Sequence, residues 1–212
     1  RSYAELDKEG ARVDKWFRDN RIDYDVQLND AFYAKSGFDR GHMARREDAE
    51  WGRSLALAKL SADLTCSYAN AAPQVPALNR ARFGAKGKWG LLETELLEKG
   101  IENEPGKAGR MCVFAGPLFD DDNDPVFKGV QIALDFFKVV VWYDGDGELR
   151  TTCYRLSQEK LVGQIEFEML RFDEVFKTYQ VPIDKIERAT GLKFHPNIAD
   201  RDTSSGDEDV IA

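Results

Sequence analysis

The sequence predicts an α+β fold, in which helices pack on a core of mainly antiparallel sheet. The first observation is a hairpin pattern, because the apolar segments 136–143 and 149–154 flank the turn residues Asp144-Gly145-Asp146-Gly147. The second is helical periodicity, since apolar residues recur every three or four positions over residues 50–62 and again from Trp89 to about Gly100. Strands joined by a short turn run antiparallel, so the two observations together predict this class.

Capping residues predict two further helices. Ser157 is a suitable N-cap for a helix that continues to about Tyr179. A last short helix is expected to begin at Pro182 and to end at Gly191, because proline favours the first turn of a helix and glycine the position after the last.

The other segments are less regular. Residues 64–69 and 111–115 are short apolar runs that predict strands, and residues 70–74 predict a turn through their Asn and Pro content. Residues 1–37 show no regular period, and their aromatic side chains stand among charges, as in a loop-rich segment that wraps around a core.

The length of 212 residues is sufficient for one domain with its own core. We expect a single domain over residues 1–198 and an acidic, disordered tail over residues 199–212. The tail carries half of the formal net charge of −8. This acidic balance disfavours tight non-specific binding to nucleic acid, although a metal ion and a few arginines can still hold a phosphate locally.

The composition indicates an ordinary globular protein. Cys66, Cys112 and Cys153 lack the spacing of a zinc site, so buried free thiols are expected. An apolar run of about eighteen residues does not occur, so no membrane span is expected. The chain starts at Arg1 with neither an initiator methionine nor a signal-peptide pattern, as expected of a chain that lacks its native N-terminus, and its cellular location cannot be read.

The segment Asp39-Arg40-Gly41-His42 carries the chemistry. A histidine can accept a proton near neutral pH, and the planar guanidinium of an arginine can bind a phosphate through paired donors. The glycine allows a close approach of the backbone to a bulky ligand. These residue types together indicate hydrolysis of a phosphodiester, with His42 as the general base and Arg40 as the phosphate contact.

Two later residues could complete such a site. Asn79 offers a neutral carbonyl oxygen, which suits a magnesium ion that keeps most of its water ligands, and Glu93 could accept hydrogen bonds from those waters. The alternative for Asn79 is a turn residue, and the alternative for Glu93 is an exposed position on a helix.

In these motifs the chain resembles the DNA/RNA non-specific endonucleases. The family signature is DRGH, then S/T-N-x-x-P-Q, then L-N-Q/R, then W-x-x-L-E. The chain has these motifs in the same order, as Asp39-Arg40-Gly41-His42, Ala69-Asn70-Ala71-Ala72-Pro73-Gln74, Leu78-Asn79-Arg80 and Trp89-Gly90-Leu91-Leu92-Glu93. The resemblance continues through Phe114-Ala115-Gly116-Pro117 to the segment 181–194. It spans roughly residues 10–195.

The resemblance implies a ββα-metal nuclease site within the α+β domain. His42 would be the general base, Asn79 the direct ligand of Mg²⁺ (with Mn²⁺ able to replace it), and Glu93 a catalytic group that acts through metal-bound water. Arg40 would contact phosphate, while Arg45, Arg80 and Asn70 would help to bind substrate. Asp39 and Gly41 would shape the motif. Members of the family cut both DNA and RNA and leave 5′-phosphates.

The chain departs from the family pattern before Glu93. The family places its glutamate eight residues after the metal-binding asparagine on one helix, whereas here the separation from Asn79 is 14 residues. A continuous helix would hold the two residues about 21 Å apart, too far to share one ion. We therefore expect residues 82–87 to bulge out as a loop.

Some residues have a structural alternative to binding. Arg45 and Arg46 could extend a phosphate-binding track or form an exposed basic pair balanced by Glu47 and Asp48. Asn70 could instead stabilise its turn through side-chain hydrogen bonds. The second histidine, His195, is expected at the surface.

Three functions are therefore to be compared. The first is a Mg²⁺-dependent endonuclease with DNA and RNA as substrates. The second is a catalytically weak module of the same fold that binds nucleic acid or a regulatory partner, and the third is a small-molecule phosphodiesterase. The resemblance also implies a homodimer, and the toxicity of a free nuclease leads us to expect an inhibitor or a longer parent chain that controls it.

Overall fold

The computed structural model describes residues 14–80, 111–144, 146–162, 178–204 and 209–211. The chain divides into two compact units, Arg1–Gln74 and Val75–Ala212. The predicted class is confirmed: helices accompany sheets whose strands all pair antiparallel. Within the described ranges, no helix has the length and apolar character needed to cross a lipid bilayer.

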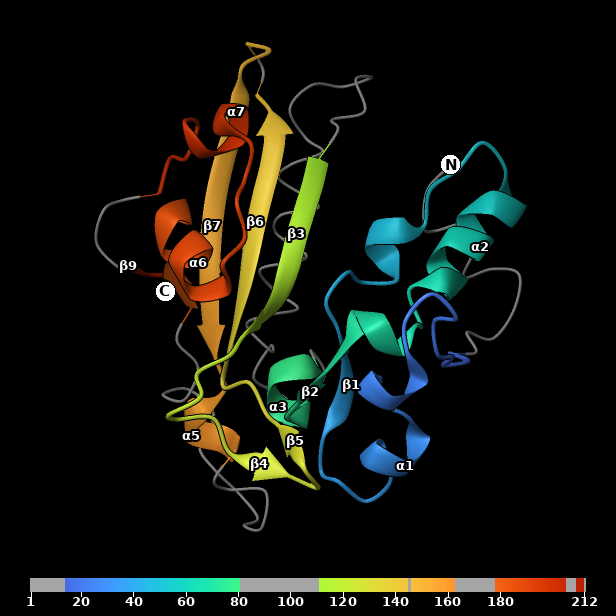
Figure 1. Cartoon of the computed structure of the whole chain (residues 1–212). Coiled ribbons are helices and arrows are strands. Elements are labelled where there is room, and N and C mark those ends of the chain that lie inside the picture. The colour runs from blue at the N-terminus through green and yellow to red at the C-terminus, as the bar shows by residue number, and fades with distance from the viewer. Residues whose placement is uncertain (1–13, 81–110, 145, 163–177, 205–208, 212) are drawn as a thin grey trace. The chain divides into compact units, whose positions relative to one another are not determined.

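The first unit is built on a two-stranded ribbon. Strand β1 (Asp39–His42) pairs antiparallel with β2 (Ala71–Gln74), so that Arg40 lies opposite Pro73 and His42 opposite Ala71. Short helical segments precede β1 or separate it from β2 in the chain (Figure 1), namely η2 (Tyr24–Val26), α1 (Asp30–Tyr33), η3 (Glu47–Ala49), α2 (Leu55–Leu64) and η4 (Tyr68–Asn70).

Helix α2 confirms the predicted helix with shifted bounds. It begins after Ser54, whose hydroxyl accepts a hydrogen bond from the backbone N–H of Leu57 at 3.3 Å. Its buried positions hold the small residues Ala58 and Ala62. Trp51, which falls within the predicted helix, lies before α2 and is 72% exposed.

The prediction for residues 64–74 assigned the strand and the turn to the wrong segments. The expected strand at residues 64–69 is replaced by a turn and by η4, and the expected turn at 70–74 contains strand β2. Thr65 ends α2 by donating its hydroxyl to the carbonyl of Ala62 at 2.7 Å. Pro73 is tolerated in β2 because β1 is the strand's one partner within its two-stranded sheet, and an edge strand can lack an N–H donor.

The second unit contains a five-stranded sheet with the order β3-β6-β7-β8-β9. Its strands are β3 (Met111–Leu118), β6 (Asp135–Tyr143), β7 (Leu149–Ser157), β8 (Thr178–Gln180) and β9 (Asp209–Ile211). A small ribbon pairs β4 (Val126–Phe127) with β5 (Val130–Gln131), and the helices are α3 (Pro76–Asn79), α5 (Glu159–Val162), α6 (Ile183–Thr190) and α7 (Pro196–Ala199).

The β6–β7 hairpin is confirmed and is longer than predicted. Its register runs without interruption from Asp135 opposite Ser157 to Tyr143 opposite Leu149. Gly147 takes the positive φ of 80° in the connecting turn, a conformation that glycine adopts without strain. The helix predicted after Ser157 begins as α5, but its expected end at Tyr179 was wrong, because Tyr179 lies in strand β8.

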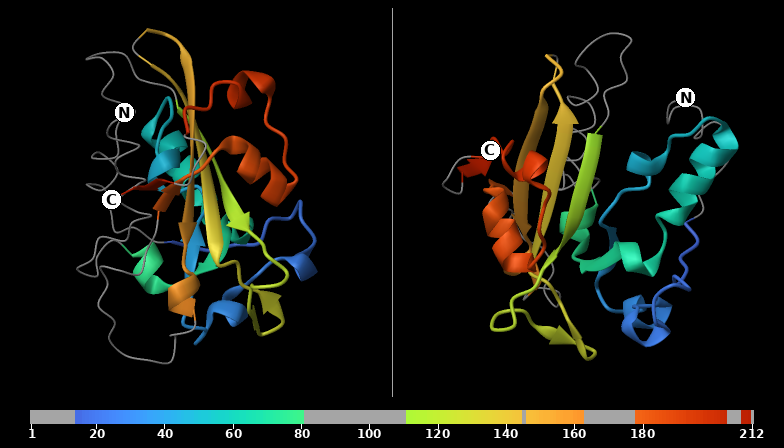
Figure 2. Two further views of the ribbon diagram at one scale, coloured as in Figure 1. Left: turned by 90° about the vertical axis from the view of Figure 1, so that its left-hand side faces the viewer. Right: turned by 45° about the horizontal axis from the view of Figure 1, so that its top comes forward.

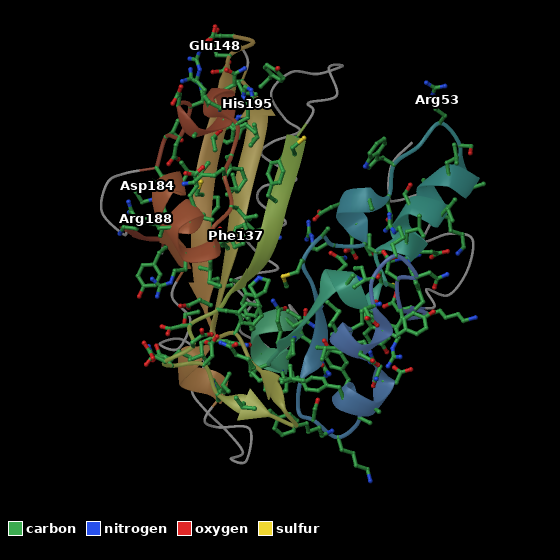
Figure 3. The ribbon with its side chains drawn as sticks, in the orientation of Figure 1. Arg53, Phe137, Glu148, Asp184, Arg188 and His195 are labelled. Carbon is green, nitrogen blue, oxygen red and sulfur yellow. The ribbon has the colours of Figure 1, made fainter. Side chains whose placement is uncertain are left out.

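One face of the sheet is covered by the C-terminal helices. Figure 2 shows α6 and α7 on this face. In the hydrophobic cluster beneath α6, Ile183 and Ile186 of the helix are buried together with Phe137, Val139 and Cys153 of β6 and β7. The predicted bounds of α6 are confirmed, with Pro182 as N-cap and Gly191, at φ 70°, as C-cap. In Figure 3, Phe137 lies on the sheet, and Asp184 and Arg188 lie on the outer side of α6, where they form a 2.6 Å ion pair.

Residues 201–203 form hydrogen bonds with α6 and β7, and the disordered tail expected over residues 199–212 stays a prediction. The carboxylate of Asp202 accepts a hydrogen bond from the N–H of Ile183 at 2.7 Å, and Thr203 and Arg201 bond to the backbone of Thr151. The acidic residue is therefore used as an acceptor at the start of α6 rather than as a solvated charge. Of the cysteines, Cys66 and Cys153 are buried as expected, whereas Cys112 is exposed.

Candidate active site

Strand β1 presents Arg40 and His42 two residues apart. Since alternate side chains of a strand point to the same face, the two groups lie on one side of the ribbon. Gly41 between them has an ordinary strand backbone, but a Cβ atom there would stand 2.1 Å from Oε1 of Gln74, whose side chain is fully buried. The space taken by Gln74 therefore requires glycine at this position.

The loop after His42 is held by Asn70. Its side-chain oxygen accepts the N–H of Ala44 at 2.9 Å, and its NH₂ group donates to the carbonyls of Ala44 (2.8 Å) and Thr65 (2.9 Å). The backbone carbonyl of Asn70 also accepts the N–H of Met43 at 2.9 Å. The Asn70 side chain thus makes the turn-stabilising hydrogen bonds that were one of its two predicted roles. Its contact with substrate stays a prediction.

The imidazole of His42 is partly buried and has two close neighbours. The ring of Trp16 packs on it at a centroid distance of 4.7 Å and an interplanar angle of 52°. The Sγ atom of Cys66 lies 3.9 Å from Nε2. These contacts restrict the plane of the ring, as a proton-accepting group requires.

Three aromatic rings surround the guanidinium of Arg40. Its central carbon lies 5.1 Å from the centroid of Tyr33, 5.9 Å from Trp16 and 6.0 Å from Tyr68. A cation is attracted to the electron-rich face of such rings within about 6 Å. Burial raises the pKa of the Tyr33 phenol, so this ring is a neutral neighbour.

Asp30 of α1 accepts hydrogen bonds from two of these groups. Its Oδ1 receives the hydroxyl of Tyr68 at 2.5 Å and Nη2 of Arg40. The bond from Tyr68, and then the bond from Arg40, hold the pKa of the Asp30 carboxyl below its ordinary value. The N-cap Asn29, which accepts the N–H of Phe32 at 3.2 Å, fixes the first turn of α1 and with it Asp30.

The following basic pair is engaged in ion pairs. Arg45 bonds to Asp48 at 3.1 Å, and Arg46 is buried and bonds to Asp63 at 2.7 Å. The alternative of an exposed basic pair is therefore wrong for Arg46. A substrate contact of Arg45 stays a prediction.

The predicted metal ligand lies in the second unit. Asn79 is the last residue of α3, and Arg80 is its exposed C-cap. Helix α3 is anchored by Leu78, which is fully buried, and by Gln158, which accepts the N–H of Val75 at 3.0 Å and donates to the carbonyl of Ala133 at 2.8 Å. Glu93 lies outside the described residues, among which no group of three or more His, Cys, Asp or Glu side chains is arranged to hold a metal.

Four residues around Arg40 were not predicted from the sequence: Trp16, Asp30, Tyr33 and Tyr68. They come from the loop-rich N-terminal segment and from η4. An isolated aromatic or acidic residue in such segments has no periodicity that would distinguish a contact with Arg40 from a position at the surface. His195, the other histidine, is exposed as expected, and its Nδ1 accepts the N–H of Asn197 at 3.2 Å at the start of α7.

The chain is similar to known proteins over nearly its whole length. The model of the DNA/RNA non-specific endonuclease family matches residues 2–201. The protein y4fB of Sinorhizobium fredii, which is uncharacterized, is 34% identical over 96% of this chain and 32% of its own length. Mitochondrial endonuclease G of Homo sapiens is 30% identical over 82% of this chain and 54% of its own length.

A solved structure is also similar. A chain in the crystal structure of the EndoG/EndoGI complex, which addresses the mechanism of EndoG inhibition, has a TM-score of 0.60 and 26% identity. The match covers 87% of this chain and 69% of that chain, and it confirms the predicted fold class. The present chain spans only about a third to a half of the length of the curated relatives.

Proposed function

We propose, since the chain belongs to the DNA/RNA non-specific endonuclease family, that it hydrolyses phosphodiester bonds of DNA and RNA with little sequence preference. The observation that carries this proposal is the ring of Trp16, which contacts the imidazole of His42 and the guanidinium of Arg40 at once. A proton acceptor and a phosphate-binding cation are thereby held side by side on one strand. Because a proton acceptor for water and a cation for phosphate act on the backbone linkage that DNA and RNA share, such a pair would act on either nucleic acid.

In this mechanism His42 takes the proton from the attacking water. Arg40 binds the phosphate oxygens and opposes the negative charge that develops on them. The guanidinium has five N–H donors and uses one terminal nitrogen on Asp30, while its Nε is buried without a hydrogen-bond partner. The donors that Asp30 does not occupy can therefore bind a phosphate oxygen.

A divalent metal fits the residues that the family pattern assigns to it. Asn79 provides a half-buried amide oxygen, and one neutral protein ligand is compatible with Mg²⁺, which keeps several of its waters. When bound, the ion would stabilise the negative charge on the phosphate and on the leaving oxygen. Asn79 would hold it directly, Glu93 through water, and Mn²⁺ could take its place; 5′-phosphate ends are proposed as the product.

The two histidines of the chain provide a matched test. Replacement of His42 by alanine is expected to lower the rate of plasmid and RNA cleavage in Mg²⁺ by about 10²–10⁴-fold, because the general base is lost. The same replacement at the exposed His195 is expected to leave the rate unchanged. Thermal melts would show whether both variants are folded.

Retained activity in the folded His42→Ala protein would refute the assignment of the base. Wild-type protein that binds nucleic acid but does not cut it with any divalent metal would instead support the binding module. A homodimer, an inhibitor and a longer parent chain stay predictions. The inhibitor is supported by the complex in which the similar EndoG structure was solved, and the parent chain by the greater length of the relatives.

A further inference from the structure

An open cavity of about 530 Å³ lies in the first unit. Its walls include the aromatic residues Trp16, Phe17, Tyr24 and Tyr68, together with Arg18 and Asp30. Trp16 packs on the imidazole of His42, and Tyr68 and Asp30 are the neighbours of Arg40 described above. Three residues of the cavity wall therefore contact Arg40 or His42.

Two aromatic rings of this cavity are exposed. Tyr24 is 50% exposed and Phe17 is 36% exposed, so both rings present apolar surface to solvent. The guanidinium of Arg18 lies 5.4 Å from the ring centroid of Tyr24. A pocket with ring faces as walls and a cation at one wall matches a planar aromatic ligand attached to an anionic group.

The charge of Asp30 does not oppose such a ligand. Arg40 and the hydroxyl of Tyr68 both bond to its carboxylate, so the negative charge at this wall is compensated. A second hollow of about 450 Å³ shares Phe17 and Arg18 and adds Arg21, but Arg21 is held by Asp19 through two hydrogen bonds, at 2.9 and 2.6 Å. The first cavity is thus the better candidate.

We propose that this cavity binds an unpaired nucleobase of the nucleotide that adjoins the phosphate held by Arg40. The proposal rests on the proposed nuclease function and specifies its substrate class. A base inside a duplex is stacked on both faces and cannot enter a pocket without being extruded, which costs a few kcal/mol. The chain therefore prefers single-stranded or locally unpaired nucleic acid, and stacking on ring faces leaves the identity of the base open.

Tyr24 allows a test that does not depend on catalysis. It lines the cavity, and its hydroxyl donates to Asn20 at 3.0 Å. Tyr24→Ala removes ring and hydroxyl, whereas Tyr24→Phe removes the hydroxyl alone. Trp51→Ala is the control, because this tryptophan is 72% exposed and is not part of the cavity wall.

The measurement is fluorescence anisotropy of a labelled single-stranded oligonucleotide and of the matching duplex, in EDTA and at one ionic strength. We expect wild type to bind the single strand more tightly than the duplex. Tyr24→Ala should weaken single-strand binding about tenfold, a typical effect of losing one stacked ring, and should not change duplex binding. Tyr24→Phe and Trp51→Ala should bind like wild type.

Equal binding of both substrates by wild type would overturn the proposal, as would unchanged single-strand binding by Tyr24→Ala. The two proposals can fail separately. If wild type cleaves nucleic acid but Tyr24→Ala binds normally, the base pocket is wrong and the nuclease stands. If wild type never cleaves but shows the expected pattern of binding, the pocket stands and the nuclease is wrong.

Discussion

Two antiparallel pairs of strands in this protein are stabilised in different ways. The β6–β7 pair is nine residues long, and six consecutive residues of β6 are buried. The β1–β2 pair is four residues long, and Gly41 is the one buried residue of β1. The long pair buries mainly apolar side chains of β6, whereas Arg40 of β1 is held from outside the ribbon by the carboxylate of Asp30.

The long pair contributes mainly to stability, and the short pair carries the residues of the proposed reaction. As the proposed phosphate contact and general base, Arg40 and His42 need access to a polar substrate, so the strand that carries them cannot be covered by an apolar core. Hydrogen bonds and ion pairs hold strand β1 in place instead. A change in the sheet of the second unit should therefore affect unfolding, and a change in the ribbon should affect the site.

The largest effect on stability is expected for Phe137→Ala. Phe137 is 4% exposed and packs against Gly116 opposite to it, with 3.0 Å between the ring and the position of a Cβ atom on that glycine. The loss in the free energy of unfolding should be about 3–5 kcal/mol, measured by urea denaturation. Cleavage well below the melting temperature should remain near the wild-type rate.

Tyr143 provides the control for this prediction. It lies at the end of the same strand and is 58% exposed, so Tyr143→Ala should change the stability by no more than about 0.5 kcal/mol. Equal losses for the two variants would show that burial does not distinguish positions along β6.

A smaller loss, about 1–3 kcal/mol, is expected for Gly41→Ala, because the new methyl group overlaps the buried Gln74 side chain. The double variant Gly41→Ala/Gln74→Ala should recover part of this loss, since the obstructing amide is removed. Additive losses in this double-mutant cycle would mean that Gly41 is required for a reason other than space.

The smallest effect is expected for Asp30→Asn and depends on pH. The pKa of Asp30 in the folded protein is lowered from the ordinary value of 3.8, so the ionised group contributes stability above that value. This contribution is lost as the pH falls through the lowered pKa. Melting temperatures of wild type and Asp30→Asn should therefore converge in acid, and a constant difference down to the lowest pH would contradict the assignment.

The sequence predicted the regions in which local signals decide the structure. The turn at Asp144–Gly147 and the caps Pro182 and Gly191 lie within a few residues of the elements that they begin or end. The β1–β2 ribbon was missed because Ala71–Gln74 pairs with a strand about thirty residues earlier, and its composition is that of a turn.

The candidate active site shows the same division. His42 and Arg40 could be proposed from the sequence because their chemistry is rare and their spacing forms a motif. Trp16 and Asp30 were not, since their contacts with these residues arise only when distant segments fold together. The placement of Glu93 stays a prediction.

In the proposed nuclease, the pairing of Arg40 with Asp30 has a consequence for how a nucleic acid would be captured. The free site presents a neutralised cation on a chain with a formal net charge of −8, so it exerts little long-range attraction on a polyanion. A phosphate would then bind to donors of a guanidinium that keeps its carboxylate partner. Short-range contacts, rather than long-range electrostatic steering, would then determine the rate of association. Because few counterions are released, this rate should depend only weakly on salt concentration.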